Sequence, residues 1–418
     1  MKTKDPRRIY LFYRGGIALI FSLVFTTSSL YHIEMVHLNP FQLVLVGTAL
    51  EVTHFLFEIP TGIVADRYSR KLSVLIGLGL IAFGLFLEGA VQSFLVILLA
   101  QVLWGLGDTF TSGADTAWIV DELGEDQMEG LFLKAAQISQ GASLIGIFVS
   151  MSLAILRPNL PFFLSGILCI ALIFLLVRHM PEKRFSIKAD STSWYNGMFT
   201  AFKEGTRILR AKHILVAAAG VMFFEGVYSE GFDRLWTAHF LNQLHDVSIY
   251  GRDELWLLAV NLLAAIFGIL LMGFLERRSE SFKPKRLYGA LFLINTGKSI
   301  SILLFALIGN VWGIAFVYCV GNSLRNSFYP LYDVWVNRQV EEPEWRATAL
   351  SMLGQLNSIG QISGGPLLGW IALKAGVPLG LVFSGVLVLP IIVIYGGFYL
   401  RQKHDKTTDK KKSNIDIA

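Results

Sequence analysis

The chain has 418 residues, of which 54% are hydrophobic and 16% charged, and its mean hydropathy is +0.55. A soluble domain carries roughly a quarter charged residues, so this chain lacks the charge to cover a globular surface in water. The composition excludes an ordinary soluble enzyme and favours an integral membrane protein. Its two cysteines, Cys169 and Cys319, lie in apolar runs and offer neither a disulfide framework nor a metal cluster.

Apolar segments follow one another along the chain, each near or above the ~20 residues that a helix needs to cross the hydrocarbon. Strands of outer-membrane barrels alternate in polarity over ~10 residues, whereas these runs are continuously apolar. Because a backbone in lipid must satisfy its own hydrogen bonds, we predict helices. We expect the first run to be a membrane span rather than a cleaved signal peptide, since no small-residue cleavage pattern follows it. The predicted spans are residues 9–33, 41–64, 72–92, 94–120, 131–156, 161–179, 213–241, 254–276, 286–309, 311–336, 346–373 and 377–400.

The distribution of basic residues predicts the orientation of these twelve helices. With the N-terminus in the cytoplasm, most of the 36 Lys and Arg residues fall on the cytoplasmic side. Only Arg157, Arg234, Arg252 and Lys374 fall on the opposite side. An even number of spans returns the C-terminus to the cytoplasm, so we expect a multi-pass protein of the inner or plasma membrane with both termini cytoplasmic.

The longest loop divides the chain into an N-terminal six-helix bundle at 1–180 and a C-terminal one at 213–402. The linker at 181–212 contains Trp194–Arg210, which is either an amphipathic helix on the inner leaflet or an ordinary linker helix. Residues 403–418 form a Lys-rich cytoplasmic tail. The halves are weakly similar, because Asp108 aligns with Asn326 and Asp115 with Asp333. We therefore predict an all-α polytopic fold of two pseudo-symmetric bundles.

Between the second and third spans stands Gly62-Ile-Val-Ala-Asp66-Arg67-Tyr68-Ser69-Arg70-Lys71. It resembles the loop 2–3 signature of the major facilitator superfamily: Gly, three residues, Asp, a base, an aromatic, Gly, Arg and a final base. The sequence departs from this signature at one position, where Ser69 replaces the second Gly. The resemblance in layout covers nearly the whole chain. It implies a transporter that works by alternating access rather than an enzyme, with this loop gating the inner side.

The chemistry of this gating motif suggests how it works. Gly62 is expected to let two helices approach closely. Asp66 can pair with Arg70 or face the positive N-terminus of a helix, which the resemblance implies is span 11. Asp121, at the end of span 4, is an expected partner of the motif's Arg. Alternatively, the bases Arg67, Arg70 and Lys71 only fix the topology.

Charged residues occur inside the spans, although each costs ~2.5–3.5 kcal/mol or more at mid-bilayer. Those considered as proton or substrate residues are Glu51, His54, Glu58, Asp108, Asp115, Glu225, Arg325 and Asp333, beside Arg14 and Lys298. The resemblance implies that spans 1, 4, 7 and 10 line the cavity, so Asp108, Asp115, Glu225 and Arg325 would face it. Asp108, Glu225 and Glu51 are the favoured carriers. Alternatively, these groups form structural ion pairs, such as Asp108 with Arg325.

Other features bear on the ligand. Trp104, Phe110, Phe224 and Phe328 are expected cavity aromatics, although aromatic residues in membrane helices mostly pack. A lone His54 beside two acids favours a proton-relay or packing role over a metal site. Gly297-Lys298-Ser299 ends like a phosphate-binding loop, but Phe292 stands where that loop needs Gly. We expect no nucleotide, nucleic acid, metal or cofactor, only a proton gradient, a small-molecule substrate and the bilayer around a monomer.

The chain also resembles proton-coupled macrolide and multidrug exporters, with departures. Their span 5 Gly-Pro signature is found here in span 11, at Gly360–Gly369, and Gln101 lies in the region of their span 4 Arg. The function predicted is proton-coupled efflux of an amphiphilic or cationic compound. Alternatives are proton-coupled uptake of a small metabolite, a lipid or lysolipid flippase, or a non-transporting sensor.

Overall fold

The computed structural model describes residues 5–125, 128–185, 203, 205–207, 209, 210, 212–244, 253–279, 284–340 and 343–401. Among these residues almost all are helical and none lies in a strand. The tail at 403–418 and most of the predicted helix at Trp194–Arg210 fall outside this part. The helices are α1 (Pro6–Glu34), α2 (Pro40–Arg67), α3 (Arg70–Ala90), α4 (Phe94–Thr111), α5 (Ala114–Leu123), α6 (Met128–Ala154), α7 (Leu160–His179), α9 (His213–Asn242), α10 (Asp253–Ser279), α11 (Pro284–Leu307), α12 (Val311–Asn337), α13 (Pro343–Ala375) and α14 (Val377–Val386).

Each predicted span falls on one of these helices or on two consecutive ones. Ten helical segments in the described part of the chain are long and apolar enough to cross a membrane. Two of these ten are longer than one labelled helix: Phe94–Leu123 joins α4 to α5, and Val377–Arg401 continues α14. The other two predicted spans correspond to α12 and α13, which are 27 and 33 residues long. They carry more polar residues, among them Arg325 and Asp333 on α12.

The prediction of one continuous helix at 94–120 is wrong. The helix stops at Thr111 and resumes at Ala114, and between them Gly113 has a φ of +72°. Residues with side chains rarely adopt this backbone conformation, and glycine adopts it without a steric cost. The last span is also interrupted, because two turn residues separate α14 from the helix at 389–401. The first of these breaks matters for the site described below.

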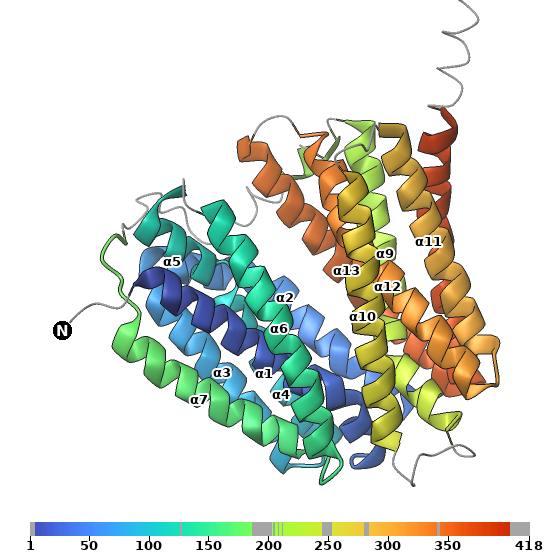
Figure 1. The fold of residues 1–418 in the computed structure, drawn as a ribbon, viewed down its shortest axis with the longest axis horizontal. Helices are drawn as coiled ribbons and strands as arrows, with labels where there is room; N and C mark the ends of the chain where they lie inside the picture. Colours follow the sequence, from blue (N-terminus) through green and yellow to red (C-terminus); the bar gives the residue numbers. More distant parts are fainter. Residues whose placement is uncertain are drawn as a thin grey trace, which may run out of the picture. The chain divides into compact units, whose positions relative to one another are not determined.

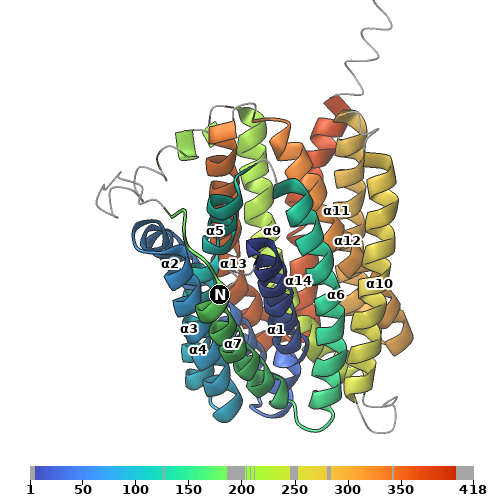
Figure 2. The same ribbon diagram turned by 60° about the vertical axis from the view of Figure 1, so that its left-hand side comes forward.

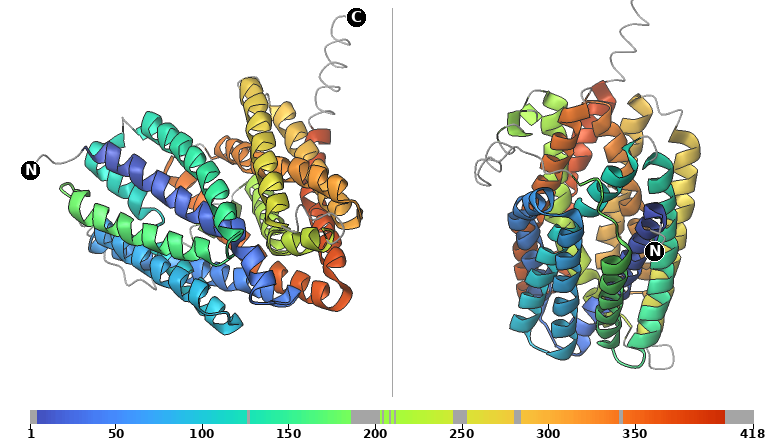
Figure 3. Two further views of the ribbon diagram at one scale, coloured as in Figure 1. Left: turned by 60° about the horizontal axis from the view of Figure 1, so that its bottom comes forward. Right: turned by 90° about the vertical axis from the view of Figure 1, so that its left-hand side faces the viewer.

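Among the described residues, those in Met1–Ala201 and His245–Leu262 form one compact unit, and those in Phe202–Leu244 and Leu263–Ala418 form a second. In the first unit, α1 packs along α6 and α7, and α4 packs between α2 and α3 (Figures 1 and 3). In the second, α9 packs against α13 and α14, and α11 against α12 (Figure 2). The expected domain limits at 180 and 213 remain predictions.

Glycines on α9 and α13 bring these two helices into close contact in the second unit. A Cβ atom on Gly360 would lie against the carbonyl oxygen of Phe223, and one on Gly364 against that of Val227. Small residues let membrane helices approach in this way. The glycine-rich segment of the eleventh span is therefore a packing surface.

Candidate transport site and gating motif

A cavity of about 380 Å³ lies within the first unit, among α1, α4, α5 and α6. The break between α4 and α5 forms part of its wall, through Thr111, Ser112 and Gly113. Its charged lining residues are Arg14, Asp108 and Asp115, and its aromatic lining residues are Tyr13 and Phe21. The two acids that the sequence places seven residues apart thus reach one cavity, although a helix break separates them.

Asp115 lies in the first turn of α5 and forms an ion pair with Arg14 of α1, with 3.1 Å between Arg14 Nη1 and Asp115 Oδ2. Its other oxygen accepts a hydrogen bond from the backbone N–H of Thr116 at 2.7 Å. A carboxylate in the first turn of a helix is also stabilised by the helix dipole. The Asp115 side chain is 6% exposed, while the Arg14 side chain is 42% exposed. The guanidinium therefore remains accessible from the cavity.

Asp108 of α4 faces His54 of α2, with 3.3 Å between His54 Nε2 and Asp108 Oδ2. The two side chains are 31% and 25% exposed, respectively. His54 was expected to group with Glu51 and Glu58 on its own helix, but it meets an acid of the neighbouring helix instead. In and beside this cavity the first unit thus brings together two carboxylates, one guanidinium and one imidazole.

The second unit contains a buried ion pair between Glu225 of α9 and Lys298 of α11. Lys298 Nζ lies 2.7 Å and 3.0 Å from the two carboxylate oxygens, and both side chains are at most 2% exposed. The Tyr228 hydroxyl donates to Glu225 Oε1 at 2.8 Å. The ammonium also lies over the rings of Phe328 and Tyr228, 4.4 Å and 4.8 Å from their centres. Because both groups are enclosed in this way, the pair resembles the structural ion pairs considered above as the alternative to a transport role.

A second ion pair in this unit joins Arg325 of α12 to Asp233 of α9. Two nitrogens of the guanidinium lie 2.6 Å and 2.7 Å from the two carboxylate oxygens, which is a bidentate geometry. The Phe232 ring lies 4.8 Å from the same guanidinium. Asp108 contacts His54 and Arg325 contacts Asp233, so the structure gives each of these two residues a partner in its own unit other than the one suggested. The sequence analysis did not single out Asp233.

The structure reveals further polar contacts that the sequence analysis missed. Glu88 of α3 is fully buried, and its two oxygens meet His32 of α1 at 2.7 Å and Gln101 of α4 at 2.8 Å. An acid within the apolar run of the third span was the available signal. Arg234, which was assigned to the side opposite the cytoplasm, lies within α9 and pairs with Glu230 at 3.1 Å.

The remaining candidates are placed as follows. The Glu58 and Asp333 side chains are exposed and Glu51 is half-buried. Phe328 is fully buried against Lys298, Tyr329 and Tyr332. Trp104 packs on Phe21 and Phe25, Phe224 on Phe223, and Phe110 is half-buried. In the cavity itself the aromatic lining residues are Tyr13 and Phe21 rather than these four.

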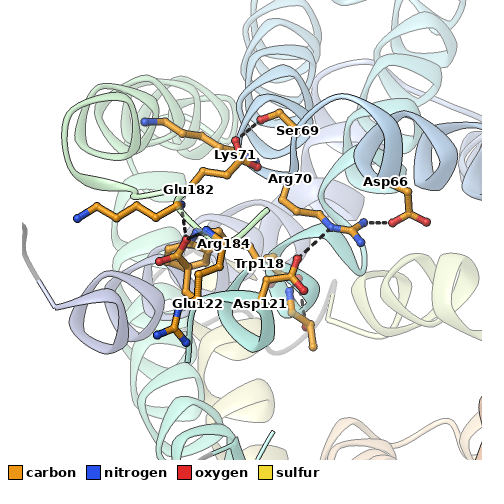
Figure 4. A network of polar contacts seen from close by, with 12 residues as sticks. Asp66, Ser69, Arg70, Lys71, Trp118, Asp121, Glu122, Glu182 and Arg184 are labelled. Atoms are coloured by element: carbon orange, nitrogen blue, oxygen red, sulfur yellow. Dashed lines mark hydrogen bonds and ion pairs between the residues drawn. The ribbon is translucent and has the colours of Figure 1, made fainter. Parts of the chain in front are cut away.

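The gating motif forms a network at one end of the first unit (Figure 4). Asp66, in the last turn of α2, pairs with Arg70, in the first turn of α3. Arg70 Nε lies 3.7 Å from Asp121 Oδ2 on α5, so the expected partner of the motif's arginine is in place. Arg67 and Tyr68 are exposed. The arginine side chain is thus held between two carboxylates from different helices.

The expected role of Gly62 is not observed. A Cβ atom at this position would meet no atom within 4 Å in the described part of the chain. The preceding residue explains this, because the Thr61 hydroxyl donates to the Thr109 carbonyl oxygen at 3.0 Å and so faces α4. The next residue along a helix points about 100° away, and Gly62 therefore faces away from α4.

The fold and these charged sites define an α-helical, multi-pass membrane protein of the secondary-transporter class. A sequence profile of the Major Facilitator Superfamily matches residues 11–340, and the chain belongs to this family. Membership points to a transporter rather than an enzyme. The uncharacterized MFS-type transporter YxaM of Bacillus subtilis (strain 168) is 24% identical over 368 residues, which are 85% of this chain and 86% of that protein.

Solved structures share the fold at low sequence identity. The nucleoside transporter NupG superposes with a TM-score of 0.73 at 14% identity, covering 94% of this chain and 99% of that one. A bacterial homolog of the human lysosomal transporter Spinster, inward-facing and unoccupied, gives 0.74 at 16%, with 94% and 96% covered. A POT family transporter in complex with 5-aminolevulinic acid gives 0.74 at 12%, again with 94% and 96% covered.

Proposed function

We propose that this transporter exports amphiphilic or cationic small molecules in exchange for protons, by alternating access of the first unit's cavity. One observation carries this proposal: Asp108 and Asp115 line the same 380 Å³ cavity, and the partner of Asp108 is a histidine. Proton binding and ligand binding are thereby brought to one place, which is what coupling requires.

The coupling step follows from the charges. While His54 holds a proton, it neutralises Asp108 across the 3.3 Å that separates them. When the proton leaves, Asp108 faces the cavity as a carboxylate beside a neutral imidazole, and a cationic ligand can take the place of the imidazolium. Proton and ligand then compete for one carboxylate, so that the binding of either promotes release of the other.

The lining of the cavity supports this class of cargo. With His54 neutral, the carboxylates of Asp108 and Asp115 outweigh the single guanidinium of Arg14. Tyr13 and Phe21 add aromatic faces, which attract a desolvated cation by about 0.5–2 kcal/mol each. A cavity of 380 Å³ lies within the roughly 300–1,000 Å³ that drug-sized ligands occupy.

Proton-driven uptake of a small polar metabolite is the second candidate. The half-exposed guanidinium of Arg14, 42% exposed, offers an anionic group a partner at the same cavity. The names of the structural neighbours, a nucleoside transporter and a POT family transporter crystallised with 5-aminolevulinic acid, fit such a cargo. A saturable uptake of one such solute would favour this alternative.

Gating and orientation complete the proposal. The Asp66–Arg70–Asp121 network opens and closes the inner side as the two units move, and breaking the Asp66 contact alters the balance between the states. The excess of Lys and Arg in alternate loops supports an orientation with both termini in the cytoplasm, and the cell membrane is the location that we propose. A single copy suffices for transport, because the cavity lies within one unit of one chain.

The test is transport of ethidium and tetraphenylphosphonium into inverted membrane vesicles with an acid interior. The parent protein should accumulate both cations, and a protonophore, which dissipates the pH gradient, should abolish this accumulation. Asp108→Asn should lower the initial rate at least ~10-fold, which equals about 1.4 kcal/mol of barrier. Glu125→Gln, which removes an exposed acid from the loop after α5, is the matched control and should transport like the parent. Full activity of Asp108→Asn, or accumulation that ignores the pH gradient, would remove the proposed mechanism.

A further inference from the structure

The loop that contains the gating motif contacts the chain segment after α7 through the side chain of Glu182 (Figure 4). The Ser69 hydroxyl donates to Glu182 Oε2 at 2.5 Å, and the backbone N–H of Lys71 donates to Oε1 at 3.1 Å. Lys71 Nζ in turn donates to the carbonyl oxygens of Val177 and Met180, both at 2.9 Å. The start of α3 and the end of α7 are therefore connected through both side chains and backbone.

The same segment is held on its other side by α5. Trp118 Nε1 donates to the carbonyl oxygen of Pro181 at 2.5 Å. Glu122 Oε1 accepts the backbone N–H groups of Lys183 and Arg184, at 2.5 Å and 3.2 Å. Since Glu122 follows Asp121, the partner of Arg70, the motif, α5 and residues 181–184 form one closed ring of contacts.

Ser69 makes two hydrogen bonds in this ring through its hydroxyl group. The hydroxyl is the N-cap of α3, accepting the backbone N–H of Leu72 at 2.9 Å, and it donates its own hydrogen to Glu182. The glycine usual at this place of the signature offers neither contact. Glu182 in turn satisfies a free backbone N–H in the first turn of α3, where a helix favours negative charge. The departure from the signature and the acid after α7 thus belong together chemically.

We propose that Glu182 is a positioning residue for the gating motif, which couples the loop between α2 and α3 to the start of the connection between the two units. Glu182 is the second residue of the connection at 181–212, so a displacement of that connection would reach the motif directly through the Glu182 side chain. Pro181 has a fixed φ and stiffens this short segment. The inference rests on the proposed alternating access, because it assigns Glu182 a part in the movement that the motif gates.

The experiment measures the conformational equilibrium itself and needs no substrate. Single-molecule energy transfer is recorded in nanodiscs between dyes on Glu125→Cys and Arg401→Cys, one exposed position in each unit. The background carries Cys169→Ala and Cys319→Ala, which remove two buried thiols. Ser69→Ala, Glu182→Gln and the double variant are compared with this background.

We expect Ser69→Ala and Glu182→Gln each to change the ratio of the inward-open to the outward-open state at least ~3-fold. The double variant should change this ratio no further than either single variant, because both substitutions remove the same interaction. Ser69→Thr retains the hydroxyl and should restore the ratio of the background. Ser152→Ala, which removes an exposed serine bonded within α6, is the matched control. Thermal unfolding of each variant shows that it is folded, and Glu182→Asp replaces Glu182→Gln if the latter is not.

The outcomes separate this inference from the proposed function. If Asp66→Asn shifts the ratio while Ser69→Ala and Glu182→Gln leave it unchanged, Glu182 has no positioning role and the gating proposal stands. Additive effects in the double variant, or failure of Ser69→Thr to restore the ratio, would also overturn the inference. If Asp66→Asn has no effect either, the gating role of the motif fails.

Discussion

The two units each contain an acid paired with a base inside the membrane-spanning helices, but the surroundings of these pairs differ. Asp108 and His54 are 31% and 25% exposed beside a cavity, whereas Glu225 and Lys298 are at most 2% exposed beneath Phe328 and Tyr228. A group must reach water or ligand to exchange a proton during transport. The pair in the first unit meets this condition, and the pair in the second unit is enclosed.

The difference shows that an acid within a span has no fixed role. The sequence treats Asp108 and Glu225 alike, as carboxylates within apolar spans, one in each half. The structure gives Asp108 a histidine partner beside a cavity and Glu225 a lysine partner in the protein core. Burial then separates a residue suited to transport from one suited to holding α9 and α11 together.

The largest effect is expected from Lys298→Met, which leaves the Glu225 carboxylate buried without its cation. Breaking a buried ion pair from one side costs about 3–5 kcal/mol of folding stability. The thermal unfolding midpoint in detergent, together with the yield of folded protein, measures this loss. The double variant Lys298→Met with Glu225→Gln should recover much of it, because no charge is then left unpaired. If Lys298→Met unfolds at the same temperature as the parent, the Glu225–Lys298 pair does not stabilise the fold.

An intermediate effect is expected from a matched pair of variants, Asp115→Asn and Glu225→Gln, each of which removes one carboxylate from an ion pair. Asp115→Asn should lower cation transport ~10-fold, about 1.4 kcal/mol, with little change in stability, because Arg14 is 42% exposed and remains hydrated. Glu225→Gln should lower stability and leave the pH profile of the remaining transport unchanged. Both transport and unfolding are measured on both variants. The reverse pattern would exchange the roles assigned to the two units.

The smallest effect is expected from Asp233→Asn, which removes the partner of Arg325 two turns after Glu225 on the same helix. The Asp233 side chain is 47% exposed and the Arg325 side chain 15%, so this pair is less desolvated than Glu225 with Lys298, and its loss should cost less than that of a fully enclosed pair. The unfolding midpoint should therefore fall much less than in Lys298→Met. An equal loss in the two variants would mean that exposure does not explain the difference between the pairs of the second unit.

Much of the fold was predictable because the bilayer allows few solutions. A backbone in hydrocarbon must form its own hydrogen bonds, so each long apolar run has to be helical, and every predicted span corresponds to a helix or to two consecutive ones. The break at Gly113 was missed, because the segment is apolar on both sides and glycine alone does not indicate a break. The motif at Gly62–Lys71 indicated the contacts of Arg70 with Asp66 and Asp121, since these follow from helix ends that meet.

Partners from distant segments were not predictable. His54 and Asp108, Glu225 and Lys298, and Asp233 and Arg325 each come from different helices, and hydropathy contains no information on which helix faces which. Glu182 was missed for the same reason, because its acid follows α7 while its donors stand at the start of α3. The departure from the signature at Ser69 was visible in the sequence, but its hydrogen bond to Glu182 could be recognised only in the structure.

The sequence by itself determined that this chain is helical, crosses the membrane many times and has the loop signature of its family, because these properties depend on composition and local order. Only the tertiary structure decided which charges are enclosed and which line a cavity. Whether an acid is enclosed or faces a cavity depends on how separate helices pack, and a carboxylate among packed aromatic rings behaves differently from one beside an open space.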